Sequence, residues 1–186
     1  MDISEEKKWY VMRDLKRANA CERAYQRLRA DGFEVYTPLT QKPIIRNGRK
    51  VYREVPYVSD LLFVRECRSV LDAEVREIDT LQYRFAKGCA WNEPMIVGDA
   101  EMERFMWVVN NFKAIQFYTP EEVSPAMYGK WIRIVGGGLD GFEGRLKSTR
   151  GSKVKRLIVE LPGLLAVGVE VDAQYIQFVK RHYGSR

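Results

Sequence analysis

The pattern of apolar residues changes at residues 113–127, and this change limits the possible folds more than any other feature of the sequence. Before it, segments with helical spacing alternate with short β-prone segments. Within it the periodicity lapses, and residues typical of a linker occur: Pro120, Glu121, Glu122, Ser124 and Pro125. After it no helical pattern is found. We therefore expect two domains, 1–112 and 128–186, joined by a linker at 113–127.

The first domain opens with a predicted strand, helix and strand. Lys8–Arg13 is aromatic and β-rich, which favours a strand. Ala18, Cys21, Tyr25 and Leu28 follow at i, i+3, i+7 and i+10, which predicts a helix ending at Asp31-Gly32. Phe33–Tyr36 alternates as a second strand. The fully apolar run Leu61–Val64 predicts a central strand of the same sheet.

The rest of the first domain predicts two more helices and a strand. Ser69 and Asp72 resemble a capping box that opens a short helix ending at Ile78. Asp99 precedes a second helix with an apolar stripe: Met102, Phe105, Met106, Val109 and Phe112. Residues 82–87 are strand-like. A sheet covered by helices is the simplest arrangement, so we expect an α+β fold.

A basic hairpin is predicted at residues 42–53. Asn47-Gly48 is a strong signal for a two-residue hairpin turn, because both residues tolerate positive φ. The twelve residues carry five positive charges and no negative ones. We expect this hairpin to project from the sheet.

The C-terminal third predicts a small all-β barrel. Five short β-prone segments are separated by Gly-rich turns: Trp131–Val135, Arg145–Thr149, Leu157–Leu161, Ala166–Val171 and Tyr175–Val179. Closure into a barrel would also remove exposed sheet edges. This region is also basic, with 11 Lys/Arg against 5 Asp/Glu in 128–186, whereas 1–112 is nearly neutral with 19 against 18. Such a balance favours an anionic partner for the C-terminal domain.

Composition argues against several classes of protein. The apolar runs are far shorter than the roughly 20 residues that span a bilayer, and the first six residues are acidic where a signal peptide is basic. We expect a cytoplasmic protein that does not enter a membrane. Cys21, Cys67 and Cys89 have no metal-ligand spacing, and the only histidine, His182, lies next to the C-terminus. We therefore expect no metal, no cofactor and no enzymatic activity.

The segment Trp131–Gly144 combines a hydrophobic strand, a glycine turn and an apolar–Gly pattern. It resembles a KOW motif through these residues: Ile132, Ile134, Gly137, Leu139, Gly141, Phe142 and Gly144. Ile132 and Ile134 are expected to point into the barrel, and the glycines to supply turn conformations barred to other residues. Leu139 and Phe142 are expected to close the end of the barrel.

The N-terminal half resembles a known domain in the order of its segments. Trp9-Tyr10-Val11, a helix, Val35-Tyr36-Thr37-Pro38, a basic hairpin and the run Tyr57–Val64 are similar to the N-terminal domain of the NusG family. That family joins this domain to a KOW domain through a linker. The resemblance covers roughly residues 7 to 180.

One segment departs from the family pattern. Val58-Ser59-Asp60-Leu61 stands where the family commonly has a Phe-Pro-Gly-Tyr or Phe-Pro-Asn-Tyr segment. This departure favours a specialised paralogue, resembling the UpxY-type antiterminators of polysaccharide operons first and RfaH second. A housekeeping elongation factor is the alternative within the family.

The resemblance implies a transcription factor that binds the clamp of RNA polymerase and DNA at the transcription bubble. By position, the polymerase-binding residues are Tyr10, Arg13, Tyr57, Leu61 and Phe63, with sheet core as the alternative role for the apolar ones. The nucleic-acid-binding residues are Arg46, Arg49, Lys50, Tyr52 and Arg53, with a solvated edge hairpin as the alternative.

The KOW domain has three expected partners by resemblance: nascent RNA, a ribosomal protein or a termination factor. Its cationic residues gather around a predicted hairpin tip: Lys147, Arg150, Lys153, Lys155 and Arg156. A solvated turn is the alternative there. For the whole chain, the rival function is a ribosome- or RNA-binding KOW protein that does not bind polymerase.

Overall fold

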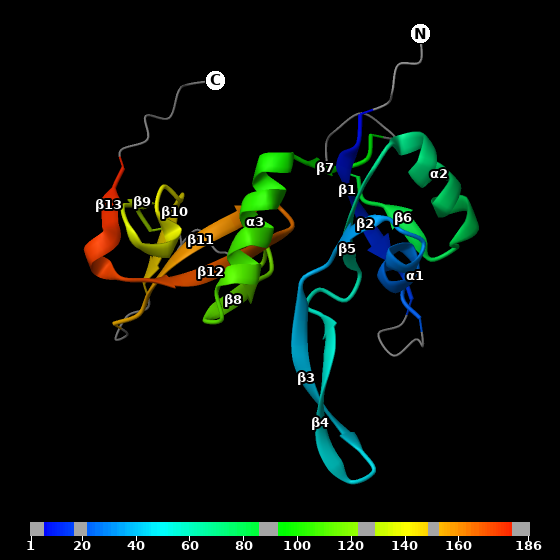
Figure 1. The fold of residues 1–186 in the computed structure, drawn as a ribbon, viewed down its shortest axis with the longest axis horizontal. Helices are drawn as coiled ribbons and strands as arrows, with labels where there is room; N and C mark the ends of the chain where they lie inside the picture. The colour runs from blue at the N-terminus through cyan, green and yellow to red at the C-terminus, as the bar shows by residue number, and fades with distance from the viewer. Residues whose placement is uncertain (1–5, 17–21, 86–92, 123–128, 149–152, 180–186) are drawn as a thin grey trace. The chain divides into compact units, whose positions relative to one another are not determined.

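A computed structural model describes residues 6–16, 22–85, 93–122, 129–148 and 153–179 (Figure 1). The chain divides into two compact units, Met1–Met102 and Glu103–Arg186. The division falls within helix α3 (Asp99–Asn111), whereas the apolar pattern predicted that the first domain ends at residue 112.

The N-terminal unit contains a five-stranded antiparallel sheet. Its strands are β1 (Lys8–Asp14), β2 (Glu34–Tyr36), β5 (Leu61–Glu66), β6 (Leu81–Tyr83) and β7 (Ile96–Val97). The order is β2-β5-β1-β6, and β7 also pairs with β1. Strand β5 lies between β2 and β1, which confirms the central strand predicted from the apolar run at 61–64. Strand β6 ends at Tyr83 and is shorter than the predicted strand.

Helices α1 (Ala24–Ala30) and α2 (Arg68–Glu77) cover one face of this sheet (Figure 1). The core between them consists of nine buried residues: Tyr10, Met12, Ala24, Leu28, Leu62, Val64, Leu71, Ile78 and Leu81. Burial of a large apolar side chain stabilises a fold by roughly 1.5–3 kcal/mol. This cluster therefore stabilises the packing of the two helices on the sheet.

Both helices begin elsewhere than predicted. Helix α1 begins at Ala24, because the carboxylate of Asp14 accepts a hydrogen bond from the Ala24 N–H at 2.9 Å and so satisfies the first turn. Ala18 and Cys21 lie outside the described residues. Helix α2 follows Cys67, which makes no side-chain cap, so the predicted capping box at Ser69 and Asp72 is wrong.

The basic hairpin is present as predicted. Strands β3 (Leu39–Arg46) and β4 (Arg49–Pro56) form a separate two-stranded sheet that extends away from the other strands of its unit (Figure 1). Asn47 and Gly48 have φ values of 51° and 72°, the positive values that a two-residue hairpin turn requires.

The C-terminal unit contains a six-stranded antiparallel sheet. Its strands are β8 (Ile115–Tyr118), β9 (Trp131–Ile134), β10 (Glu143–Ser148), β11 (Lys155–Leu161), β12 (Leu165–Val171) and β13 (Ile176–Phe178), in the order β13-β9-β10-β11-β12-β8. Short 3₁₀ turns, η2 (Gly137–Leu139) and η3 (Ala173–Tyr175), precede β10 and β13. All five strands predicted after residue 130 are present.

Strand β8 corrects the linker prediction. Ile115–Tyr118 pairs with β12, and the buried Tyr118 packs with Ile158 and Ala166, so this part of 113–127 belongs to the sheet. The prolines that follow this segment favour a linker, and only pairing with the distant strand β12 makes the segment a strand. Residues 123–127 lie outside the described part of the chain.

Helix α3 buries a slightly different stripe from the predicted one. Met102 and Phe105 are buried as expected, together with Val108, whereas Met106, Val109 and Phe112 are only half-buried. No helix in the described ranges is long and apolar enough to cross a membrane.

Candidate functional site

Among the described residues of the N-terminal unit, the β3–β4 hairpin forms the longest exposed segment. Every residue from Gln41 to Glu54 is exposed. Apolar side chains share this exposure, with Ile45 at 83% and Tyr52 at 61%. The five residues predicted to bind nucleic acid all lie in this segment, so the structure brings them together on one element.

The hairpin register divides those residues between two faces. Residues directly opposite share a face, and successive residues alternate. One face, named here the cationic face, carries the pairs Lys42↔Arg53, Ile44↔Val51 and Arg46↔Arg49. The other, the aromatic face, carries Pro43↔Tyr52 and Ile45↔Lys50. Lys42, which the sequence reasoning passed over, therefore lies with three of the predicted cations, while Lys50 and Tyr52 lie on the opposite side.

No described residue neutralises the cationic face. Across the described ranges, its four cations make no side-chain hydrogen bond and no ion pair. Glu54, the only carboxylate between residues 39 and 56, is opposite Gln41 and so belongs to the other face. Like charges directly opposite one another destabilise a strand pair. This face is therefore suited to an anionic ligand.

The residues predicted to bind polymerase do not form one surface. Tyr10 is opposite Val64 and belongs to the core covered by α1 and α2. Leu61 and Phe63 lie an odd number of residues from Val64 on β5, so their side chains point to the other face of the sheet. Arg13 is opposite Leu61 and shares that face. Leu61 and Phe63 are buried, and Tyr57 is half-buried.

Asp60 joins two arginines beside that second face. Its Oδ2 lies 3.1 Å from Nε of Arg13 and 3.3 Å from a guanidinium nitrogen of Arg84. Arg84 follows β6, and its N–H donates to the carbonyl of Val11. Sequence reasoning did not single out Arg84, because its link to Asp60 depends on the pairing of β1 with strands distant in the chain.

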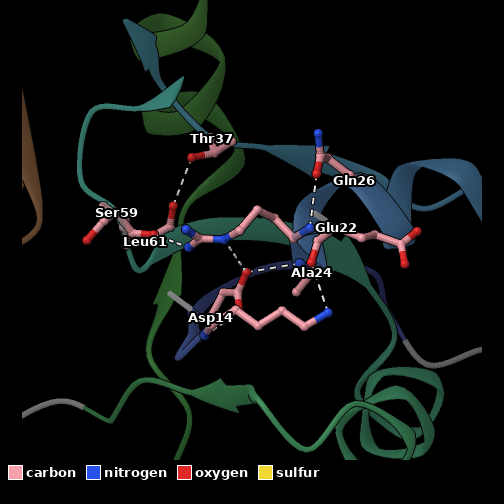
Figure 2. Close-up of polar contacts among 9 residues, drawn as sticks. Asp14, Glu22, Ala24, Gln26, Thr37, Ser59 and Leu61 are labelled. Carbon is pink, nitrogen blue, oxygen red and sulfur yellow. Dashed lines mark hydrogen bonds and ion pairs between the residues drawn. The ribbon is translucent and has the colours of Figure 1, made fainter. Parts of the chain in front are cut away.

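A buried ion pair fixes the segment that departs from the family pattern (Figure 2). Nε of Arg23 donates to Oδ2 of Asp14 at 2.9 Å, and the Arg23 guanidinium also donates to the carbonyl of Ser59. The Thr37 hydroxyl donates to the carbonyl of Leu61 at 2.9 Å. These bonds tie residues 59–61 to the beginnings of α1 and β3, which positions Asp60.

The electrostatics of this pair favour the ionised carboxylate. Burial raises the pKa of Asp14, but hydrogen bonds from the backbone N–H groups of Lys16 and Ala24, together with the Arg23 guanidinium, outweigh burial. The pKa of Asp14 therefore lies below its ordinary value.

The KOW-like residues form a buried strand followed by a glycine turn. Ile132 and Ile134 are buried, as predicted. Gly137 and Gly141 have φ values of 71° and 78°, which other residues rarely adopt. A Cβ on Gly144 would lie 2.4 Å from the carbonyl oxygen of Ile158, so this position is restricted by packing.

Two aromatic residues extend this picture. Leu139 is buried, but Phe142 is only half-buried and stacks on Trp107 of α3 with ring centroids 5.1 Å apart. Its ring packs against a helix that the apolar pattern assigned to the first domain, and the closure of a barrel end by Phe142 stays a prediction. Tyr175 lies against Gly136 and Gly137, where a Cβ would approach its ring to 3.1–3.3 Å.

The cationic cluster of the C-terminal unit is partly paired. Arg156 lies 2.9 Å from Glu170, and Nζ of Lys147 lies 4.0 Å from the ring centre of Tyr118. Lys153 is exposed and Lys155 half-buried. Arg150 and the predicted hairpin tip lie outside the described residues. Within the ranges that are described, no group of three or more His, Cys, Asp or Glu could hold a metal ion.

Comparison with known families identifies the class of protein. The family model described as transcription termination factor NusG matches residues 7–106, more than half of the chain. The chain therefore belongs to the NusG family, which is associated with transcription elongation, antitermination and RNA polymerase. No individual curated protein matches it significantly.

Proposed function

We propose that this protein is a transcription elongation and antitermination factor that binds the RNA polymerase clamp and suppresses pausing or termination. The observation that carries the proposal is the NusG family match. The match covers the unit that bears the hairpin and the contacts of Asp60 with Arg13 and Arg84. The protein acts without catalysis. Its binding favours the elongating conformation only through a higher affinity for that state than for the paused one.

The C-terminal unit completes the proposal as a KOW domain. Support comes from the six-stranded antiparallel sheet, the buried Ile132 and Ile134, and the positive φ of Gly137 and Gly141. Its partner is nascent RNA, a ribosomal protein or a termination factor.

The divergent segment 58–61 supports an operon-specific role in polysaccharide synthesis. A gene at the head of such an operon would agree with this role, and a place beside translocation genes would oppose it.

The test combines affinity capture with single-round transcription. The full chain is expected to retain core RNA polymerase and to shorten pauses on a template with a defined pause site. Arg13→Ala and Tyr57→Ala should weaken capture, whereas Arg27→Ala, on the exposed side of α1, is the matched control. Capture of ribosomes or RNA without polymerase would instead establish the rival function, an RNA-binding KOW protein.

A further inference from the structure

The C-terminal unit contains a small cavity beside the glycine turn that follows β9. The cavity has a volume of about 160 Å³. Pockets that take whole small molecules occupy roughly 300–1,000 Å³, so this one is sized for a single side chain of a partner. The groups that line it include two aromatic rings, two buried aliphatic side chains and two carboxylates: Phe112, Tyr175, Ile134, Leu139, Glu170 and Asp172.

The glycine turn keeps this cavity open because it carries no side chains. A Cβ on Gly137 would lie 3.3 Å from the Tyr175 ring, and a Cβ on Gly138 would lie 3.5 Å from the Phe112 ring. Gly136 and Gly137 have φ values of 96° and 71°, so the turn itself requires glycine there. Gly138 does not have a positive φ, so the backbone does not require its lack of a side chain. A longer side chain at Gly138 would instead fill the space beside Phe112.

The two carboxylates of the cavity differ in what already neutralises them. Glu170 lies 2.9 Å from a guanidinium nitrogen of Arg156. Asp172 is exposed, and its carboxylate accepts hydrogen bonds from the backbone and side-chain amides of Gln174 at 3.2 and 3.1 Å. Among the described residues Asp172 forms no ion pair. Amide donors leave its negative charge in place, so the cavity offers a carboxylate that no cation of the described chain compensates.

Aromatic rings beside a carboxylate suit a cationic side chain. A cation is attracted to the face of an aromatic ring, and a carboxylate adds charge-assisted hydrogen bonds. Arginine fits both groups, because its planar guanidinium stacks on rings and pairs with carboxylates, while its aliphatic stem can be buried on apolar surface. The phosphates of a nucleic acid would be repelled by Asp172.

We propose that this cavity, named here the arginine pocket, binds an arginine side chain presented by a basic segment of a partner protein. The guanidinium stacks on Tyr175 and pairs with Asp172, and the aliphatic stem lies against Leu139 and Phe112. The positive charge of residues 128–186 as a whole favours an anionic partner, whereas this pocket selects the opposite charge locally. The inference rests on the proposed KOW domain, and it adds a binding site and the chemistry of the side chain that the site takes.

The experiment titrates the isotopically labelled full chain with two peptides and follows its backbone amide NMR signals. The peptides are acetylated and amidated Gly/Ser pentapeptides that carry at the centre either arginine or citrulline, the neutral isostere of arginine. The arginine peptide should shift the amide signals of Gly136, Gly137 and Asp172 saturably. The citrulline peptide should bind about tenfold or more weakly, because it cannot form a charge-assisted hydrogen bond with Asp172.

Four variants test the parts of the pocket. Tyr175→Ala should weaken binding of the arginine peptide about two- to fivefold, the effect of one cation–π contact, whereas Tyr175→Phe retains the ring and should bind like the wild type. Asp172→Asn keeps an acceptor for Gln174 and should abolish the preference for arginine over citrulline. Gly138→Leu fills the cavity and should abolish binding of both peptides. Glu143→Gln, which removes a carboxylate outside the pocket, is the matched control.

Equal binding of the two peptides by the wild type, or binding of neither, would overturn the proposal. Binding by Gly138→Leu at the wild-type affinity would also overturn it, as would a single-stranded RNA oligonucleotide that shifts the same signals and displaces the arginine peptide. Unchanged amide signals of β9 and β13 verify that each variant keeps the fold. Because these assays contain no polymerase, their outcome is independent of the polymerase capture experiment.

Discussion

Asp14 and Arg23 form an ion pair inside the N-terminal unit, with 2.9 Å between Oδ2 and Nε and side chains only 2% and 6% exposed. The pair links the end of β1 to the start of α1, and through the Ser59 carbonyl it reaches the loop before β5. It connects the helix-covered core to the loop that carries Asp60.

Removal of either Asp14 or Arg23 should therefore lower the free energy of unfolding. Arg23→Met is expected to lower the free energy of unfolding by about 3–5 kcal/mol, because it leaves a buried carboxylate without its counter-charge. Urea denaturation followed by circular dichroism measures the change. Arg27→Ala removes the exposed pairs with Asp31 and Glu77 and is the matched control, with an expected cost of about 0–1 kcal/mol. Similar costs for both variants would contradict the structural role of the buried pair.

The ionisation of Asp14 should make the free energy of unfolding depend on pH. The folded-state pKa of Asp14 lies below its unfolded value of about 3.9, so its contribution is complete above that value and is lost as the pH falls through the folded pKa. Asp14→Asn should therefore lose less stability than the wild type between pH 6 and pH 3. Urea midpoints at these two pH values test this. Equal losses in both proteins would show that the Asp14 pKa is not depressed.

The opposed arginines predict that a charge reversal stabilises the hairpin. Arg49→Glu would face Arg46 and replace a repulsive pair with an attractive one, worth about 0.2–1 kcal/mol. Amide hydrogen exchange in β3 and β4 should slow, while DNA binding weakens. Arg49→Gln, which removes the charge without reversing it, should give an intermediate exchange rate. Faster exchange in Arg49→Glu would mean that the two side chains do not interact.

Gly144 should tolerate no larger residue. Gly144→Ala forces a Cβ toward the Ile158 carbonyl and is expected to cost about 1–3 kcal/mol through overpacking. Gly98→Ala is the control, because its Cβ would meet only the Glu101 side chain at 3.6 Å. Thermal denaturation of both variants makes the comparison. A Gly144→Ala protein as stable as the wild type would refute the close approach of β10 to β11.

Local signals made much of the fold predictable. Asn47-Gly48 predicted the turn, because these two residue types adopt positive φ more readily than others. The turn in its place sets the strand register, and the register divides the hairpin into two faces. The apolar run at 61–64 likewise predicted a central strand, since only a strand covered on both faces avoids exposing it. The turn and its flanking residues also predicted the basic hairpin, whereas the nucleic-acid-binding role of its residues came from the family resemblance.

Other features depend on contacts between distant parts of the chain. The Asp14 carboxylate, and not the apolar spacing around residue 18, determines where α1 begins. Pairing with β12 makes Ile115–Tyr118 a strand, and packing on Trp107 places Phe142 against α3. The sequence by itself determined turns, strands and the exposed basic ribbon, because these follow from the dihedral and burial preferences of neighbouring residues. Only the tertiary structure decided helix starts, the sixth strand and the Asp60 arginine pair, because each requires a partner that folding brings from elsewhere in the chain.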